Sequence, residues 1–278
     1  MPIWVDNKEI NFETYPNGET RFEVDPNAIE VRFRYREDGD LLKLWLLGQH
    51  LNDPNTLIID YMPYSRMDRT KTPDQPFTLK WVASLINCMK FDDVIVVEPH
   101  SDVTCALLDN SSPFWAVEKL LPEVMKRIQF DKDRDWLIFP DQGAAKRYEH
   151  LTGFNVGVGH KHRDFNTGQI TGLVMVGVPD QSGQNYPQAL ILDDLCSYGG
   201  TFVRCHDELK RLRFGDVHLL VAHCEQNIVK GKALDVLTSV HTTDSIWHGG
   251  KYRNLTVHPL MKIPAYKKNL NYPSPLED

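Results

Sequence analysis

The chain has 278 residues, a length that suits one large domain or two of moderate size. Its composition, with 41% hydrophobic and 25% charged residues, is ordinary for a globular protein, and its formal net charge of −7 argues against nucleic-acid binding as the main role. No apolar run approaches the roughly 20 residues that a membrane-spanning helix needs, so we expect no membrane segment.

The first residues contain no basic segment followed by an apolar one, and therefore predict no secretion signal. The five cysteines are scattered, odd in number and free of any Cys-x-x-Cys pair, which favours reduced thiols over a disulfide or zinc framework. We therefore expect a cytoplasmic protein.

Short apolar runs rich in Val and Ile recur along the chain and predict strands buried on both faces, as in a parallel sheet. The clearest runs lie in residues 55–66, 92–102, 135–147, 188–200 and 216–226. Between them, residues 77–89 and 201–214 carry apolar side chains at helical spacing. This alternation predicts a doubly wound α/β architecture with mainly parallel sheets.

The acid-rich, glycine-poor residues 127–136 separate two groups of these runs. We therefore predict two similar α/β domains, residues 1–132 and 133–278, with a site where they meet. The polar residues 159–172 predict a mobile loop or a hairpin on the second domain, and residues 265–278 predict an irregular tail.

Two predicted strands of the first domain end in polar side chains, where open α/β sheets bind ligands. Arg66 and Arg69 follow one strand in "PYSRMDR"; arginine forks suit polyphosphate oxygens, although arginines beside an Asp more often form structural ion pairs. His100 follows another strand in "EPHSD", which predicts either a ligand-binding or a structural histidine.

The second domain has a similar strand end in "PDQGAAKR". Asp141 could bind a metal ion while the backbone of residues 143–145 approaches an oxyanion, or Asp141 could simply cap a helix. Further along the chain, Lys161 and Arg163 could be solvated, or could act from a lid over a phosphoryl-transfer site.

The run "ALILDDLCSYGGTF" places Asp193 and Asp194 at the end of a buried strand. Buried carboxylates need a metal ion, a cluster of donors or ligand hydroxyls to satisfy them. The Gly-Gly-Thr of residues 199–201 can aim backbone N–H groups at an anion where a helix begins. The alternative interpretation is an ordinary strand-to-helix turn whose acids cap the helix.

Taken in order, these motifs resemble those of the ribose-phosphate pyrophosphokinases, or phosphoribosyl pyrophosphate (PRPP) synthetases. "YPNGET" is similar to the family's F-x-D-G-E, "PYSRMDR" to P-Y-x-R-Q-D-R and "EPHSD" to D-L-H. "PDQGAAKR" is similar to P-D-x-G-x-x-x-R, "HKHR" to K-x-R and "DDLCSYGGT" to D-D-x-x-D-T-G-G-T. The sequence contains neither a Walker phosphate loop nor a G-x-S-x-G elbow, which argues against a P-loop kinase and an α/β-hydrolase.

The resemblance implies two phosphoribosyltransferase-like (type I) domains that transfer diphosphate from Mg-ATP to the anomeric hydroxyl of a sugar. The ATP-binding residues that it implies are Tyr15, Asn17, Glu19, Arg66, Arg69 and His100. The implied magnesium site lies at His100 and Asp141, and the implied catalytic residues are Lys161, Arg163 and His100. The implied acceptor-binding residues are Asp193, Asp194, Ser197, Tyr198, Gly199, Gly200 and Thr201. Because the family's F-x-D-G-E element reaches a neighbouring subunit's ATP, we expect a homo-oligomer, either a dimer or a hexamer.

The acceptor loop departs from the family pattern, because Ser197 and Tyr198 stand where Asp and Thr are expected. The default acceptor is ribose 5-phosphate, which would give PRPP. An alternative is the terminal ribose of ADP-ribose, on whose adenosine extension Tyr198 could stack. Diverged synthetase-like enzymes of phage NAD⁺-restoring pathways use that acceptor, and a phage origin would place the chain in a host cytoplasm. A third hypothesis is a non-catalytic regulatory subunit, against which the joint presence of the candidate residues argues.

Overall fold

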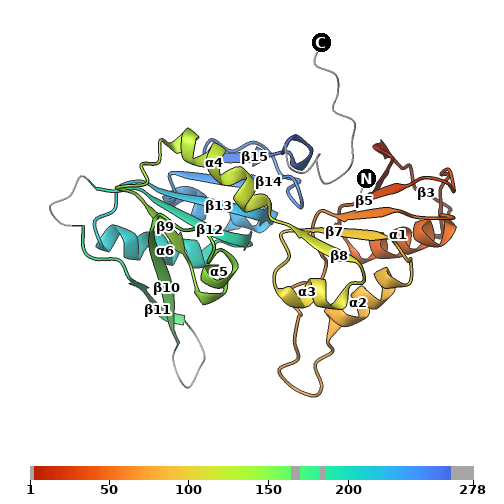
Figure 1. The fold of residues 1–278 in the computed structure, drawn as a ribbon, viewed down its shortest axis with the longest axis horizontal. Coiled ribbons are helices and arrows are strands. Elements are labelled where there is room, and N and C mark those ends of the chain that lie inside the picture. The colour runs from red at the N-terminus through yellow and green to blue at the C-terminus, as the bar shows by residue number, and fades with distance from the viewer. Residues whose placement is uncertain (1–2, 164–169, 182–185, 264–278) are drawn as a thin grey trace, which may run out of the picture. The chain divides into compact units, whose positions relative to one another are not determined.

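The structure, a computed structural model, describes residues 3–163, 170–181 and 186–263, except for the side chains of residues 161–163, 170 and 171. The chain forms two compact units, Met1–Trp115 and Ala116–Asp278, called here the first and second unit. Each unit is built on a mainly parallel sheet (Figure 1), which confirms the predicted α/β class. Within the described ranges, no helix is long and apolar enough to span a membrane.

The first unit contains a sheet whose strand order is β2-β1-β5-β6-β7-β8. Its elements in chain order are β1 (Ile3–Val5), β2 (Lys8–Glu9), β3 (Glu13–Thr14), β4 (Thr20–Arg21), β5 (Glu30–Phe33), α1 (Asp38–His50), β6 (Thr56–Ile59), α2 (Thr78–Asn87), β7 (Asp93–Val97), α3 (Asp102–Leu107) and β8 (Ser111–Phe114). Strands β5 to β8 are parallel, whereas β1 is antiparallel to both of its neighbours. Strands β3 and β4 pair separately as a two-stranded ribbon.

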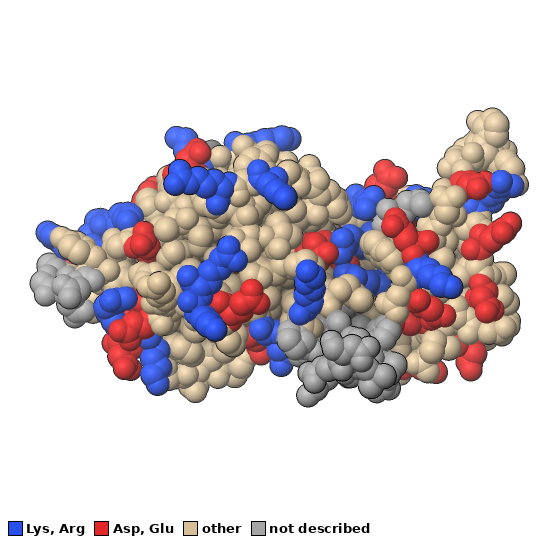
Figure 2. Space-filling view, turned by 90° about the horizontal axis from the view of Figure 1, so that it is seen from above, with Lys and Arg blue, Asp and Glu red and all other residues tan. Residues whose placement is uncertain are grey.

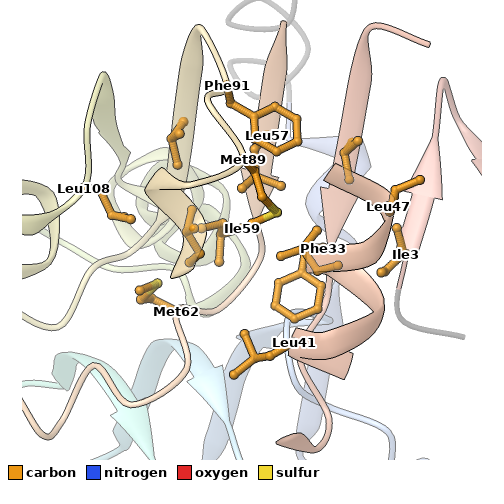
Figure 3. Close-up of a cluster of buried hydrophobic side chains, with 14 of the residues drawn as sticks. Ile3, Phe33, Leu41, Leu47, Leu57, Ile59, Met62, Met89, Phe91 and Leu108 are labelled. Atoms are coloured by element: carbon orange, nitrogen blue, oxygen red, sulfur yellow. The ribbon is translucent and has the colours of Figure 1, made fainter. Parts of the chain in front are cut away.

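The core of the first unit lies between this sheet and its helices (Figure 3). Phe33, Leu57 and Ile59 project from the strands, and Leu41 and Leu47 project from α1. The predicted helix of residues 77–89 is confirmed as α2, which buries the apolar face that the spacing indicated. Burial of this apolar surface is what holds the strand ends, and hence the polar side chains that follow them, in place.

The second unit contains a sheet whose strand order is β11-β10-β9-β12-β13-β14-β15. Its elements in chain order are α4 (Ala116–Ile128), β9 (Trp136–Phe139), α5 (Gln142–Arg147), β10 (Asn155–Arg163), β11 (Ile170–Val176), β12 (Ala189–Cys196), α6 (Gly200–Arg211), β13 (Val217–Cys224), η1 (Gln226–Lys230), α7 (Ala233–Val236), β14 (Ser239–Thr243), β15 (Leu255–His258) and η2 (Leu260–Lys262). Only the β10–β11 pair is antiparallel among the described strands of this sheet, so the polar segment predicted as a loop or a hairpin is built on a hairpin.

Helices α4 and α6 cover opposite faces of the second sheet (Figure 1). Phe202, Cys205 and Leu209 of α6 pack against alternate residues of β12 and β13. Helix α4 buries Leu120 and Val124 and contacts β12 and β13. Because α4 packs on this sheet, the two units divide between Trp115 and Ala116, earlier in the chain than the boundary after residue 132 that the composition predicted.

The charged side chains of the surface are mixed in sign. On the face drawn in Figure 2, lysines and arginines lie among aspartates and glutamates rather than in one continuous basic area. That face therefore presents no broad phosphate-backbone footprint of the kind that nucleic-acid-binding proteins carry.

Candidate active site

The strand order of the second sheet reverses between β9 and β12, which are neighbours in space although β10 and β11 come between them in the chain. Ligands of open α/β sheets bind outside the carboxyl ends of the strands at such a point. Asp141 follows β9 directly, and Asp193 and Asp194 lie near the end of β12. The fold therefore brings three of the predicted acceptor and metal residues to one place in the second unit.

Arg147, at the end of α5, is the partner of both adjacent carboxylates. Its Nη1 donates to Asp193 Oδ1 at 3.2 Å and to Asp194 Oδ1 at 3.0 Å. The side chains of Arg147 and Asp194 are 9% and 7% exposed, so the ion pairs are largely shielded from water. Burial, and then the neighbouring charge of Asp194, raise the pKa of Asp193 well above its ordinary value, while Arg147 lowers it. The donor that two buried acids require is thus an arginine of the protein itself.

Asp141 caps helix α5. Its Oδ1 accepts hydrogen bonds from the backbone N–H groups of Gly143 at 3.0 Å and Ala144 at 3.2 Å. Asp141 is therefore a helix cap in the structure, and a carboxylate in that position can still contribute to a metal site. The next residue, Gln142, contacts His160 of β10 through a 2.7 Å contact between Nε2 atoms.

The loop that carries residues 197–201, the acceptor loop, turns sharply into α6. Gly199 has φ +78°, and a Cβ added there would lie 2.4 Å from Ala233 Cβ, so both the turn and the close packing require glycine. A Cβ on Gly231 would likewise lie 2.0 Å from the carbonyl oxygen of Tyr198. The N-cap of α6 is Gly199 itself, with no side-chain cap, so the interpretation of Asp193 and Asp194 as helix caps is wrong.

The two residues that depart from the family pattern have different surroundings. Ser197 donates through Oγ to Glu225 Oε2 at 2.5 Å, and Asn227 Nδ2 donates to the same oxygen at 3.0 Å. Tyr198 is 55% exposed. No local motif in the sequence marks Glu225, because it follows a strand whose end carries no glycine turn or acid pair. Only the register between β12 and β13 brings it to Ser197.

In the first unit, Asp68 organises the "PYSRMDR" segment. Arg69 donates to both carboxylate oxygens of Asp68, at 2.7 and 2.9 Å, and Ser101 Oγ donates at 2.8 Å. The Arg69 hydrogen bonds lower the pKa of Asp68 to about 2, with burial acting in the opposite direction. Arg69 therefore forms the structural ion pair that was one of the two predictions for this segment. Arg66 is exposed, and His100 is partly exposed beside Ser101.

A second carboxylate fixes the same segment from α1. Asp38 Oδ1 accepts the hydroxyls of Tyr35 at 2.7 Å and Tyr64 at 2.5 Å. Tyr64 has φ +61°, an uncommon conformation for a residue other than glycine. The tyrosine hydrogen bonds lower the pKa of Asp38. This contact holds the turn that leads to Arg66, and no motif in the sequence signalled it.

Tyr15, Asn17 and Glu19 all lie in the exposed turn between β3 and β4. The N–H of Glu19 donates to Asn17 Oδ1 at 3.2 Å, and the N–H of Tyr15 donates to the carbonyl of Glu19 at 2.8 Å. Lys161 and Arg163 lie on β10, two residues apart, and their side chains fall outside the described part of the structure.

The described residues contain no group of three His, Cys, Asp or Glu side chains placed to hold a metal ion. A single carboxylate is nevertheless compatible with magnesium, because Mg²⁺ in phosphoryl-transfer sites is held by one or two carboxylates together with substrate oxygens and water. Asp141 supplies a carboxylate of that kind at the switch point.

Comparisons with known proteins agree on one family. No protein-family model matches the chain. The ribose-phosphate pyrophosphokinase of Pyrococcus furiosus is 26% identical over 248 residues, which span 84% of this chain and 85% of that protein. The ribose-phosphate pyrophosphokinase of Sulfolobus acidocaldarius is 25% identical over 224 residues, or 72% of this chain and 75% of that protein.

A solved structure of phosphoribosylpyrophosphate synthetase from Mycobacterium smegmatis has a TM-score of 0.72 and 19% identity, and the match covers 94% of this chain and 90% of that chain. This likeness shows the fold, two phosphoribosyltransferase-like units of type I. The curated relatives match a large share of the chain and carry the same family name. Over most of its length the chain is thus similar to the ribose-phosphate pyrophosphokinases, which are diphosphotransferases, and these relatives support its assignment as a diverged member of that family.

Proposed function

We propose that the chain transfers the terminal diphosphate of Mg-ATP to the anomeric hydroxyl of a 5-phosphorylated ribose and releases AMP. In this reaction the anomeric oxygen attacks the β-phosphorus, the bond from that phosphorus to the bridging α-β oxygen breaks, and the hydroxyl proton is lost. The observation that carries the proposal is the arrangement of Arg147, Asp193 and Asp194 beside the Gly199 turn, at the switch point of the second sheet.

Each group has a defined role in this proposal. Asp193 and Asp194 accept hydrogen bonds from the ribose hydroxyls while Arg147 orients both carboxylates and opposes the rise in the pKa of Asp193. The backbone N–H groups of the acceptor loop bind the 5-phosphate where α6 begins. Diphosphoryl transfer needs positioning and neutralisation of charge rather than a protein nucleophile. Lys161 and Arg163 would supply that neutralisation from the β10–β11 hairpin, and Arg66 and His100 would bind the ATP phosphates.

Magnesium would be held by Asp141 together with oxygens of ATP and the ribose, with His100 beside the ATP phosphates. The ion would neutralise phosphate charge as diphosphate moves. Asp141 is suited to this position because its hydrogen bonds to the start of α5 fix its carboxylate.

Ribose 5-phosphate is the acceptor that similarity to the ribose-phosphate pyrophosphokinases implies. ADP-ribose is a second candidate acceptor, which one observation favours. Tyr198 stands where the family pattern has a threonine, and it is 55% exposed. The replacement removes the threonine hydroxyl, which could bind a terminal phosphate close to the backbone. It also offers an aromatic ring to a ligand that extends beyond the phosphate.

The test is AMP release from Mg-ATP with ribose 5-phosphate and with ADP-ribose, each offered separately. Asp194→Asn should reduce turnover with any accepted ribose by at least about 100-fold, because a ribose ligand of the transition state is lost. Unchanged turnover in this variant would remove Asp194 from the site. Absence of AMP release with every acceptor would favour the non-catalytic subunit instead.

Lys161 provides an independent test of the reaction. We expect Lys161→Ala to lower kcat by about 100-fold or more with little change in the KM for ATP, because transition-state charge loses its partner. A rise in the KM for ATP at unchanged kcat would assign Lys161 to nucleotide binding rather than to catalysis.

We also propose that the exposed β3–β4 ribbon reaches the ATP of a second subunit in a homo-oligomer. The ribbon projects Tyr15, Asn17 and Glu19 into solvent within one chain, which leaves them available to another. Mixing Glu19→Ala chains with Asp194→Asn chains should then restore part of the activity that each lacks. Two inactive proteins that stay inactive when they are unfolded and refolded together would contradict this proposal.

A further inference from the structure

Tyr64 has an uncommon backbone conformation two residues before the exposed Arg66. Its φ of +61° lies in the left-handed region, which a tyrosine adopts only where its surroundings hold it there. The carbonyl of Tyr64 accepts the N–H of Met67 at 2.8 Å, so Tyr64 is the first residue of a turn that encloses Ser65 and Arg66. The direction in which this turn presents Arg66 therefore depends on Tyr64.

A carboxylate fixes the side chain of Tyr64. The hydroxyl of Tyr64 donates to Asp38 Oδ1 at 2.5 Å, and the hydroxyl of Tyr35 donates to the same oxygen at 2.7 Å. The centroids of the two rings lie 6.5 Å apart, and both rings pack against the core of the first unit. Hydrogen bonds from hydroxyls to a carboxylate are short and strong. Asp38 therefore holds the ring of the residue that begins the turn.

Asp38 lies in the first turn of α1, and that turn is itself well fixed. Asp40 Oδ2 accepts the N–H of Glu37 at 3.3 Å, and Lys43 Nζ donates to Asp40 Oδ1 at 2.9 Å. Asp40 is buried, so the start of the helix belongs to the packed part of the unit. The contact with Asp38 thus attaches the turn to a rigid helix rather than to another loop.

The other end of the same segment is anchored by Asp68. This carboxylate is buried and accepts the hydroxyl of Ser101 at 2.8 Å, which joins the segment to the strand end that carries His100. Arg66 lies between the two anchors, and its side chain is exposed. A charged side chain on a backbone that is held at both ends is preorganised, and a ligand that it binds has less ordering entropy to overcome.

We infer that Asp38 and Tyr64 are positioning residues for the nucleotide, which hold the backbone of Arg66 in its binding conformation before ATP arrives. The inference rests on the proposed function of Arg66 as a ligand of the ATP phosphates. Asp38 and Tyr64 act through Arg66 and not through contact with the nucleotide. Loss of their hydrogen bond should therefore weaken ATP binding and leave the acceptor and the chemical step unaffected.

The experiment compares Tyr64→Phe with Tyr35→Phe in the full-length chain. Each variant removes one hydroxyl from the same oxygen of Asp38, but only Tyr64 belongs to the segment that carries Arg66, so Tyr35→Phe is the matched control. Asp38→Ala removes the acceptor of both hydroxyls, and Asp38→Asn is the conservative variant, because its amide oxygen can still accept them. The readouts are kcat, the KM of Mg-ATP and of the acceptor, and the Kd of Mg-ATP by calorimetry without acceptor.

We expect Tyr64→Phe and Asp38→Ala to raise the KM and the Kd of Mg-ATP about fivefold, while kcat and the KM of the acceptor stay within about twofold of wild type. Tyr35→Phe and Asp38→Asn should keep both nucleotide constants within about twofold of wild type, because the link to Tyr64 remains. In an Arg66→Ala background, Tyr64→Phe should add less than about twofold, since two residues that act through one contact are not additive.

Unchanged nucleotide constants in Tyr64→Phe, or an equal loss in Tyr35→Phe, would overturn the inference and leave the proposed function in place. A full effect of Tyr64→Phe in the Arg66→Ala background would also overturn it, because the ring would then act elsewhere. If Arg66→Ala binds Mg-ATP as wild type does, the proposed role of Arg66 fails and the inference falls with it.

If no protein releases AMP, the proposed function fails, and the Kd values of Mg-ATP alone decide the inference. Thermal unfolding gives the folded fraction of each variant at the assay temperature. A loss of ATP affinity in Tyr64→Phe that only matches a loss of folded protein would count against the positioning role.

Discussion

At the scale of single residues, the decisive feature of the second unit is that Arg147 serves two carboxylates at once. The sequence showed that Asp193 and Asp194 need a partner, and it offered a metal ion, protein donors and ligand hydroxyls without choosing between them. The choice depends on β9 lying beside β12, which places the end of α5 over the acids. A spacing of 46 residues between Arg147 and Asp193 carries no local signal of that contact.

We predict that Arg147→Gln lowers the free energy of unfolding by about 3 kcal/mol at pH 7, because two buried carboxylates lose their cation. The loss should be smaller at pH 5. Without Arg147 the folded pKa of Asp193, already raised, rises further, so the folded state binds the extra proton and gains stability as the pH falls. Urea unfolding at both pH values measures this difference. An equal loss at pH 5 and pH 7 would mean that packing, not charge, is what Arg147 supplies.

The acceptor loop gives a second residue-level prediction. Gly199→Ala should lower the free energy of unfolding by about 2 kcal/mol or more, because it adds a Cβ at positive φ and against Ala233. Gly200→Ala is the matched control, since its Cβ would meet only the flexible end of Arg204 at 3.5 Å. Thermal unfolding of the two variants should separate them clearly, and similar melting temperatures would contradict the glycine requirement.

At the scale of elements, a continuous line of polar side chains lies between α4 and the second sheet. His218 is hydrogen-bonded to Gln188 and Ser239, and Ser239 to His241 at 3.0 Å. His241 then contacts His258 at 3.2 Å, and His258 approaches Glu123 of α4 at 3.4 Å. Burial is the largest cause lowering the pKa of all three histidines, and it brings the pKa of His241 to about 3.

These histidines predict acid sensitivity of the second unit. Because their folded pKa values lie below the ordinary value of 6.5, the unfolded chain binds protons first, and stability falls as the pH drops below that value. Arg127 of α4 adds to the effect on His241 and His258, whereas Glu123 opposes it at His258, and Asp135 and Asp216 oppose it at His218.

His241→Gln isolates this effect. It removes one titrating group, so between pH 6 and pH 5 the free energy of unfolding should fall less steeply than in wild type, by about 1 kcal/mol per pH unit. The measurement is urea unfolding across that range. Parallel pH profiles for the two proteins would show that His241 is not among the groups that make the unit acid-sensitive.

The elements themselves were largely predictable because their signals are local. The apolar runs of β6, β7, β9, β12 and β13 and the amphipathic spacing of α2 and α6 each lie within one segment. Contacts such as Ser197 with Glu225, or Asp38 with Tyr64, depend on strand register and loop closure across the chain. No short-range pattern records such contacts, so they had to come from the structure.

At the scale of the whole molecule, the sequence predicted two domains but not that α4 belongs to the second unit. The charged residues 127–136 look like a linker by composition, whereas the boundary is set by the sheet on which α4 buries Leu120 and Val124. Burial of the apolar face of α4 on the second sheet stabilises this packing by about 25 cal/mol per Å² of apolar surface. The boundary therefore follows from this packing and not from the polar composition of residues 127–136.

A fragment of residues 116–278 should therefore fold alone, and one of residues 133–278 should not. The shorter fragment leaves the α4-facing side of the sheet and its line of histidines exposed to water. Circular dichroism and cooperative urea unfolding distinguish the two outcomes. Equal cooperativity of both fragments would show that α4 is dispensable and would favour the boundary predicted from composition.

The distribution of thiols gives the molecule a built-in reporter. Cys88 is exposed and Cys105 partly so, and both belong to the first unit, while the second unit buries Cys196, Cys205 and Cys224 completely. A maleimide dye added to the native protein will therefore mark the first unit, and the second unit becomes reactive only when its sheet opens. The order in which the five positions acquire label during denaturation tells which half of the molecule unfolds first, without any mutation being introduced.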